Sequence, residues 1–208
     1  MALVKYNNNS ISAVTSASSI PSGALTHIKT LTASSSATLS FVDGSSDVVL
    51  DSTYPIYKFE FINIHPASDG VDFQFNMSSD SGSNYNVTKT STWFYAYNSY
   101  AISGLNGVEY NGSFDLAQST SDQILTNNIG ADNDQSASGS LFIFNPSSTT
   151  FVKHFIANIN TYHGANQSVN SFISGYGNTT SSINAFVFKM VSGNIDSGTI
   201  KLYGIKDS

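Results

Sequence analysis

Few side chains in this sequence have the type and spacing needed for acid–base catalysis. The chain has four histidines, and none of them forms the HExxH or His-x-His pattern that binds catalytic zinc. They are His27, His65, His154 and His163. Glycoside hydrolysis needs two carboxyl groups on either side of a sugar bond. The only glutamates are Glu60 and Glu109, and the sequence pattern indicates no second carboxyl group that would pair with either of them. A depolymerase is therefore a minor alternative, and we predict no catalytic residue.

One acidic segment has part of a calcium-binding pattern. Asp132-Asn133-Asp134 places oxygen ligands at alternate positions, as the start of a calcium loop does. The rest of that loop is wrong, because position six would be Ala137 instead of glycine and position twelve would be Ile143 instead of glutamate. The segment therefore favours a solvated turn, and we predict no bound metal and no cofactor.

The most suggestive group of side chains is the aromatic run at 93–100. Strand alternation would place Trp93, Tyr95 and Tyr97 on one sheet face. Such rings pack well in a core or a subunit interface, which is the favoured interpretation, and they also stack on sugars. With His163 in the nearby polar loop, these residues are the candidate contacts to a glycan or a protein partner.

The elements around this run have the period-two pattern of β-strands. Apolar residues alternate with polar ones at 37–42, 57–61 and 71–77. Further strands are expected at 87–97, 140–145, 150–159, 169–176, 183–190 and 198–205. The best helical candidates, 99–109 and 115–129, are interrupted by glycines. We therefore predict an all-β fold, an antiparallel β-sandwich of eight to ten strands with jelly-roll topology.

Two parts of the chain differ in composition. Residues 7–24 are rich in Asn, Ser, Ala and Gly with isolated apolar residues, so we expect an extended N-terminal arm over 1–24. A frayed terminus is the equal alternative. Residues 25–208 are expected to form a single β-sandwich domain. The first residues lack the apolar run of a signal peptide and no stretch reaches the length of a membrane helix, so we expect synthesis in the cytoplasm and no membrane insertion.

The charge of the chain argues against binding to nucleic acid. Eight basic and 14 acidic residues give a net charge of −6, whereas phosphate binding needs clustered Lys and Arg. Charged residues make up 11% of the chain, against about 25% in an average soluble domain. A neutral polar surface suits close packing of identical subunits, so we expect a homo-oligomer, with a trimer as the first expectation.

Three segments carry a resemblance to a known group of proteins. They are residues 1–7, residues 54–66 and the closing segment 192–205. Together they resemble short virion proteins of marine tailed phages. The closing Ser-Gly-x-Ile-x-Leu-Tyr-Gly pattern looks like the last strand of phage fibre, baseplate and capsid-surface modules, and Phe142-x-Phe144-Asn145-Pro146 with Lys153 fits the same pattern. The motifs are structural, so no functional residue follows from them.

The resemblance implies a component of the virion that contacts other virion proteins. A short arm before one domain favours a small, non-enzymatic decoration or adaptor subunit on the capsid or tail. The alternative is a tail-fibre or spike module that binds host-surface glycans through Trp93, Tyr95, Tyr97 and His163.

Overall fold

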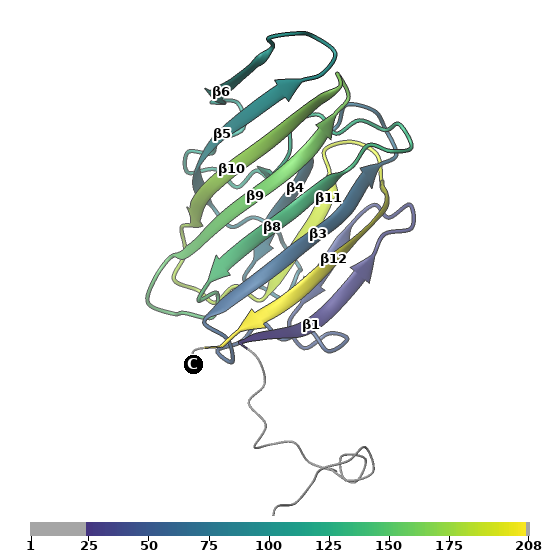
Figure 1. Ribbon diagram of the computed structural model, residues 1–208. Coiled ribbons are helices and arrows are strands. Elements are labelled where there is room, and N and C mark those ends of the chain that lie inside the picture. Colours follow the sequence, from purple (N-terminus) through teal and green to yellow (C-terminus); the bar gives the residue numbers. More distant parts are fainter. Residues whose placement is uncertain (1–23, 207–208) are drawn as a thin grey trace, which may run out of the picture.

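Alternating burial along the chain produces two antiparallel β-sheets and no helix in the computed structural model, which describes residues 24–206. The strands, drawn in Figure 1, are β1 (Leu25–Thr32), β2 (Leu39–Val42), β3 (Ile56–Pro66), β4 (Phe73–Ser78), β5 (Lys89–Ser99), β6 (Asn106–Tyr110), β7 (Gln123–Ile124), β8 (Ala137–Phe144), β9 (Lys153–His163), β10 (Gln167–Gly177), β11 (Ala185–Met190) and β12 (Ile195–Ile205). No helix within this part of the chain is long and apolar enough to cross a membrane.

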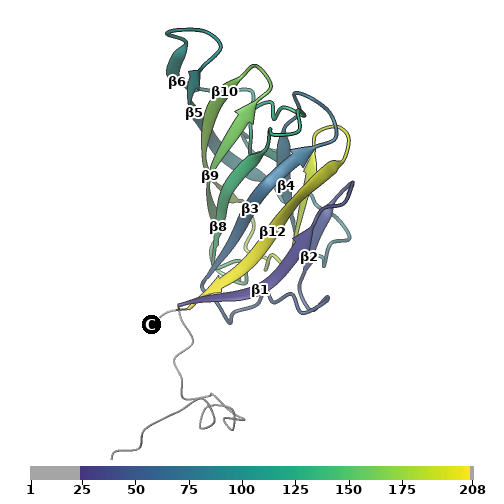
Figure 2. The same ribbon diagram turned by 45° about the vertical axis from the view of Figure 1, so that its right-hand side comes forward.

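The two sheets differ in size. The larger has eight strands in the order β1-β12-β3-β8-β9-β10-β5-β6, and the smaller has four in the order β2-β11-β4-β7. Figures 1 and 2 show the small sheet lying against one face of the large one, behind its centre. Within residues 24–206, the other face of the large sheet has no layer over it. We call this uncovered side the outer face.

The core between the sheets is built from phenylalanines. Phe188 of β11 packs against Phe59 and Phe61 of β3, with ring centroids 5.0 and 5.3 Å apart. Phe75 of β4 meets Phe155 of β9 edge to face at 5.3 Å. All five side chains are almost completely buried, and a buried Phe contributes roughly 2 kcal/mol from the hydrophobic effect alone. The aromatic core therefore holds the two sheets together.

The β-sandwich predicted from the sequence is confirmed, and the jelly roll is not. A jelly roll has eight strands in two Greek keys, whereas here β8, β9 and β10 follow one another both in sequence and in one eight-stranded sheet. The segments 99–109 and 115–129 contain the short strands β6 and β7 joined by turns. The predicted arm, residues 1–24, lies outside the described residues except for Ala24.

Candidate functional site

Trp93 lies on the inner face of β5 and belongs to the core. It is fully buried, its indole packs edge to face against Phe114 at 5.0 Å, and its Nε1–H donates to the carbonyl oxygen of Ile124 at 3.2 Å. Both faces of the ring are thus enclosed by protein. Trp93 is not placed to contact a glycan or a partner, because no part of it reaches the surface.

Tyr95 and Tyr97 lie beside Trp93 and form a cluster with one carboxylate. Their hydroxyls donate to the two oxygens of Glu109, each at 2.9 Å, because β6 pairs with β5 in a register that sets Glu109 opposite Tyr95. Burial and the bond to Glu109 raise the pKa of Tyr95, and the bond to Glu109 raises the pKa of Tyr97. Both tyrosines therefore stay protonated and hold β6 in place.

His163 does not join this cluster. It pairs with Gln167 at the β9–β10 turn, whereas Tyr97 aligns with Val169 and Thr161, so His163 lies two strands away from β5, or about 10 Å. Its Nδ1 accepts the backbone N–H of Ala165 at 2.9 Å. Burial lowers the pKa of His163, and the Asp69 carboxylate opposes that shift. The four predicted contact residues thus share a sheet face without forming one site.

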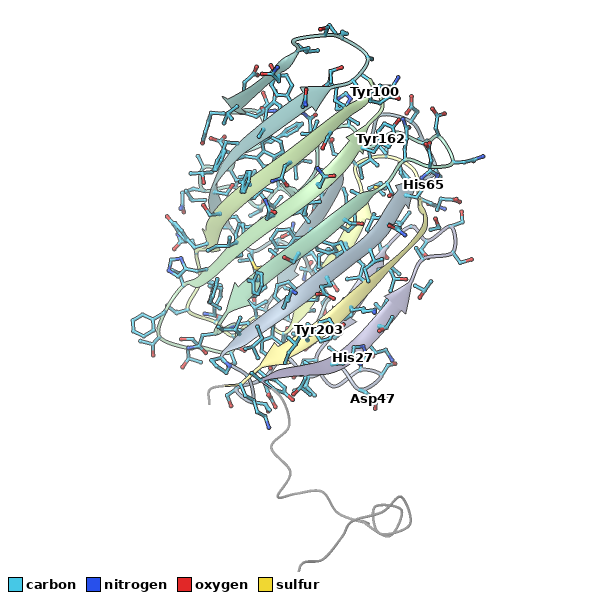
Figure 3. The ribbon with its side chains drawn as sticks, viewed as in Figure 1. His27, Asp47, His65, Tyr100, Tyr162 and Tyr203 are labelled. Atoms are coloured by element: carbon cyan, nitrogen blue, oxygen red, sulfur yellow. The ribbon has the colours of Figure 1, made fainter. Side chains whose placement is uncertain are left out.

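The outer face holds a different surface, on strands β8, β9, β10, β5 and β6. Along these strands the even-numbered side chains point outward, for example 154–162 on β9, while the odd-numbered ones point inward and are mostly buried, except toward β6 and the strand ends. None of these outward residues is Asp, Glu, Lys or Arg. We call this surface the uncharged patch. Figure 3 looks onto it, with Tyr100 and Tyr162 at one end.

Apolar side chains occur on all five strands of the uncharged patch, in two groups offset by one outward position between β9 and β10, where Ile156 pairs with Ser174 and Phe172 pairs with Asn158. Phe142 pairs with Ile156, and Phe94 pairs with both Phe172 and Tyr110. Phe94 and Phe172 stack with centroids 5.0 Å apart and planes 9° apart. Ile156 is 50% exposed, Phe94 41% and Tyr110 59%. These five residues, which we call the apolar ridge, leave much apolar surface in contact with water.

A hollow of about 430 Å³ lies beside the ridge. Its walls are larger side chains, including His154, Ile156 and Tyr176, and at its centre are the short side chains of Thr92 and Ser174. The two hydroxyl oxygens lie 2.9 Å apart and bond to each other. Most of the surface that lines the hollow is apolar. The hydroxyl groups of Thr92 and Ser174 already have each other as hydrogen-bond partners.

The opposite half of the large sheet has a charged outer surface. Lys58 and Glu60 of β3 form an ion pair at 2.7 Å, and Lys201 of β12 lies opposite Glu60. The Lys58 ammonium also lies 5.7 Å from the centre of the Phe142 ring. This ion pair therefore marks the border of the uncharged patch.

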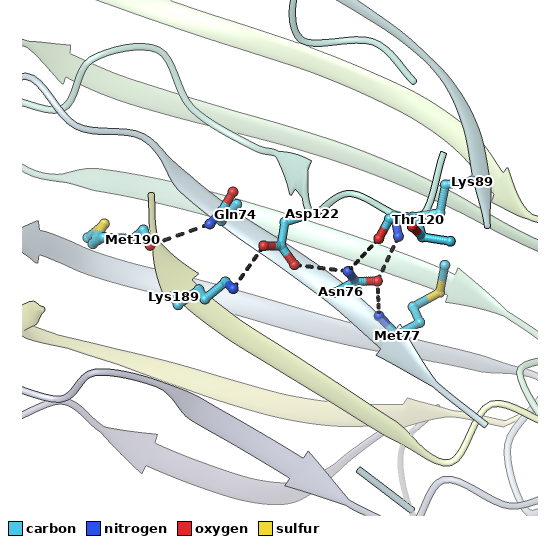
Figure 4. Close-up of polar contacts among 8 residues, drawn as sticks. All are labelled: Gln74, Asn76, Met77, Lys89, Thr120, Asp122, Lys189 and Met190. Carbon is cyan, nitrogen blue, oxygen red and sulfur yellow. Dashed lines mark hydrogen bonds and ion pairs between the residues drawn. The ribbon is translucent and has the colours of Figure 1, made fainter. Parts of the chain in front are cut away.

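A buried polar network connects the two sheets at another place (Figure 4). Lys89 is fully buried, and its Nζ donates to Asn76 Oδ1 at 2.6 Å and to the Val87 carbonyl at 2.8 Å. Asn76 Nδ2 in turn donates to Asp122 at 2.9 Å, and Asp122 pairs with Lys189 at 2.9 Å. Burial lowers the pKa of Lys89 to about 8, and Asp122 partly opposes this. Its Lys89–Asn76 end is buried, whereas Asp122 and Lys189 are partly exposed, and we assign the network a structural role because it links the two sheets.

Among the described residues, the titratable side chains of His65, Asp134 and Asp196 line one polar hollow of about 470 Å³. Across residues 24–206, no three His, Cys, Asp or Glu side chains gather as a metal site would require. Asp132 closes a turn, since its carbonyl oxygen accepts the N–H of Gln135 at 2.8 Å. His65 Nδ1 is held by the Gln135 carbonyl at 2.7 Å.

Comparison with known protein families, with curated proteins and with solved structures finds no match for this chain. The uncharged patch therefore has to be interpreted from its own residues.

The sequence reasoning overlooked the outer face, although a signal was present. Residues 141–144 read LFIF, 155–157 read FIA and 93–97 read WFYAY, so neighbouring positions are apolar where a strand with one solvated face would alternate. On β3 the same sheet alternates Tyr57-Lys58-Phe59-Glu60-Phe61. The unbroken apolar runs thus identify the strands whose outer face is also apolar.

Proposed function

We propose that this protein is a non-enzymatic structural subunit of a tailed-phage particle, a small decoration or adaptor protein that contacts a neighbouring subunit through the uncharged patch. The observation that carries the proposal is the apolar ridge on a sheet face free of charged side chains. Segments 54–66 and 192–205, which resemble phage virion proteins, coincide largely with β3 and β12 of the same sheet.

The composition of the patch matches that of a protein interface. Interface cores are enriched in aromatic residues and depleted in charged ones, and they are surrounded by a polar rim. Here the ridge contains Phe94, Phe142 and Phe172, and the Lys58–Glu60 pair lies at its border. Large exposed apolar patches on soluble proteins mark contact sites. The patch is thus suited to hold a neighbouring subunit.

Quantitative mass spectrometry of purified particles tests this proposal. We expect the protein at a fixed copy number per particle, and we expect Ile156→Asp to reduce its incorporation because a buried, unpaired carboxylate is costly. Val191→Asp is the control, since Val191 is also exposed, at 54%, but lies at the end of β11 in the other sheet. Detection of the protein only in infected-cell lysate would refute the proposal.

A second candidate function is recognition of host-surface glycans by a fibre or spike module. It is favoured by the Tyr95–Tyr97–Glu109 cluster, because a carboxylate held beside two aromatic rings is a common way to bind sugar hydroxyls. Tyr97→Phe combined with Glu109→Gln should then weaken adsorption to host cells while the fold persists. Unchanged adsorption would remove this candidate.

A further inference from the structure

We infer that the uncharged patch is covered by the same patch of a second copy of this chain, so that two large sheets pack face to face about a two-fold axis. The inference rests on the proposed function in one respect, namely that the patch is a contact surface. It adds the identity of the partner and the symmetry of the contact.

The strand sequences indicate that a further layer belongs on this face. Strands that are buried on both sides have continuous apolar runs, and strands with one solvated face alternate. The runs at 141–144 and 93–97 are of the first kind, yet residues 24–206 provide a layer on the inner side only. The residues of β8 and β5 therefore fit a strand with protein on both sides.

The size of the patch is that of one side of a stable interface. Strands lie about 4.8 Å apart and residues advance about 3.3 Å along a strand. Five strands of five to eleven residues, about nine on average, thus extend over roughly 24 by 30 Å, or about 700 Å². One partner in a standard protein interface buries about 800 Å². A single copy is enough to cover the patch.

Charge favours a second copy at this place. The chain has a net charge of −6, so two copies repel each other wherever their acidic side chains would meet. The outward residues of β8, β9, β10, β5 and β6 include no Asp, Glu, Lys or Arg, and His154 is the one imidazole among them. The patch lets two like-charged molecules approach without placing equal charges opposite each other.

Shape also favours a self-complementary contact. A two-fold contact pairs the same surface on both copies, so that each feature must meet its counterpart. The apolar ridge lies directly beside the hollow, and Ile156 belongs to both. A rotation of 180° about an axis between them would set the ridge of one copy over the hollow of the other.

The same geometry favours a protein side chain over a sugar as the occupant of the hollow. The partly exposed aromatic ring of the lining, Tyr176, packs against His154 with ring centroids 6.0 Å apart, so part of its surface is already covered. The hydroxyls of Thr92 and Ser174 bond to each other. An apolar side chain of a protein fits this lining. Because the uncharged patch is a single surface that one second copy covers, a dimer is favoured over the trimer that the sequence suggested.

Sedimentation equilibrium of the full chain over a range of concentrations tests the inference. We expect a dimer for the wild type, and for Ile156→Asp a dissociation constant at least about 100-fold higher, because two carboxylates would be buried without partners. Val191→Asp should dissociate as the wild type does. Circular dichroism of each variant confirms that the fold is retained.

A second variant tests whether dissociation of the dimer results from blocking the patch and not from another effect of the aspartate at position 156. The chain has no cysteine, so Ser174→Cys introduces a single thiol in the hollow, and its modification with a bulky maleimide should dissociate the dimer. A monomeric wild type at every concentration, or an oligomer that both Ile156→Asp and the modified Ser174→Cys leave intact, would overturn the inference. The copy number of the wild type in purified particles does not depend on which partner covers the patch, so it tests the proposed function separately.

Discussion

At the scale of single residues, Lys89 shows how a buried charge is tolerated in an all-β core. Its ammonium donates two hydrogen bonds to oxygens of Asn76 and Val87, while Asp122 is reached only through the Asn76 amide. Hydrogen bonds without a direct counter-ion do not repay the full cost of desolvation. The pKa of Lys89 is therefore lowered to about 8.

This shift predicts a specific pH dependence of stability. The folded-state pKa of about 8 lies below the ordinary value of 10.5, so between these values the unfolded chain binds more protons, and stability rises with pH. The gain is of the order of 3 kcal/mol at most. Urea unfolding of the wild type and of Lys89→Met from about pH 7 to about pH 10 measures it.

The difference between the two unfolding curves isolates Lys89, because the tyrosines contribute equally to both proteins. We expect the free energy of unfolding of the wild type to increase relative to that of Lys89→Met as the pH rises. Lys201→Met, on the outer face of β12, serves as the control and should follow the wild type. Parallel curves for wild type and Lys89→Met would contradict the assigned burial of a charged amine.

The strand pattern determined only part of the predicted contact site, which included Trp93, Tyr95 and Tyr97. Alternation correctly places the three side chains on one face of β5. It could not tell whether that face is inside or outside, because Phe94 and Ala96 make the other face apolar too. The partner Glu109 lies across the sheet on β6, and a pairing register is not visible in a single sequence.

At the scale of elements, β6 depends on a small number of contacts. It is the edge strand of the large sheet and most of its residues are exposed, so its attachment relies on backbone pairing with β5 and on the bonds from Tyr95 and Tyr97 to Glu109. An edge strand held in this way should open locally at a low free-energy cost.

Glu109→Ala should therefore loosen β6 without unfolding the sandwich. Removing the acceptor of two phenol hydrogen bonds costs about 1 kcal/mol or more, so we expect amide exchange in 106–110 to accelerate roughly tenfold. Hydrogen–deuterium exchange by mass spectrometry measures this. Glu60→Ala on β3 is the control, and unchanged exchange in β6 would show that the hydroxyl bonds do not hold the strand.

The bulge between β3 and β12 depends on one glycine. Gly198 has a φ of +119°, and a Cβ there would lie 2.6 Å from the carbonyl oxygen of Asn63. Gly198→Ala should destabilise the fold by about 2 kcal/mol or more, measured by urea unfolding. Gly112→Ala is the control, because the added carbon meets nothing within 4 Å. Equal urea midpoints for the two variants would refute the role of Gly198 in the bulge.

The sequence predicted the elements unevenly for identifiable reasons. Strands β3, β4 and β12 alternate or are bounded by clear turns, and their positions follow from the pattern. Strands β6 and β7 are short and largely set by tertiary contacts, since β7 has two residues and pairs only with β4. The connection of strands between sheets depends on packing, which explains why the jelly-roll prediction went further than the pattern allowed.

At the scale of the whole molecule, the two sheet faces have different environments. The inner face of the large sheet is sealed by the small sheet through an aromatic core, and the outer face is divided into a charged half at β1, β12 and β3 and the uncharged patch. A protein that exposes an aromatic surface of this extent is expected to bury it in its functional state. This exposed surface is the reason for proposing that the molecule is one component of a larger assembly.

Salt should affect that assembly in a defined direction. The contact itself carries no ion pair between copies, and the net charge of −6 opposes association. Screening of this repulsion should make the dimer equal or tighter as the salt concentration rises. Sedimentation at low and high salt measures the dissociation constant, and a dimer that weakens strongly with salt would indicate a charged interface elsewhere on the molecule.

The measurement that tests the central claim most directly is hydroxyl-radical footprinting of the protein when dilute and when assembled, either with itself or on particles. Protection should appear at Phe94, Phe172 and Tyr110 on the uncharged patch, while Phe151, which is 68% exposed in the β8–β9 turn, should react equally in both states. Protection confined to Phe151 or to other surfaces, with the ridge equally reactive throughout, would contradict the claim that this patch is the contact surface.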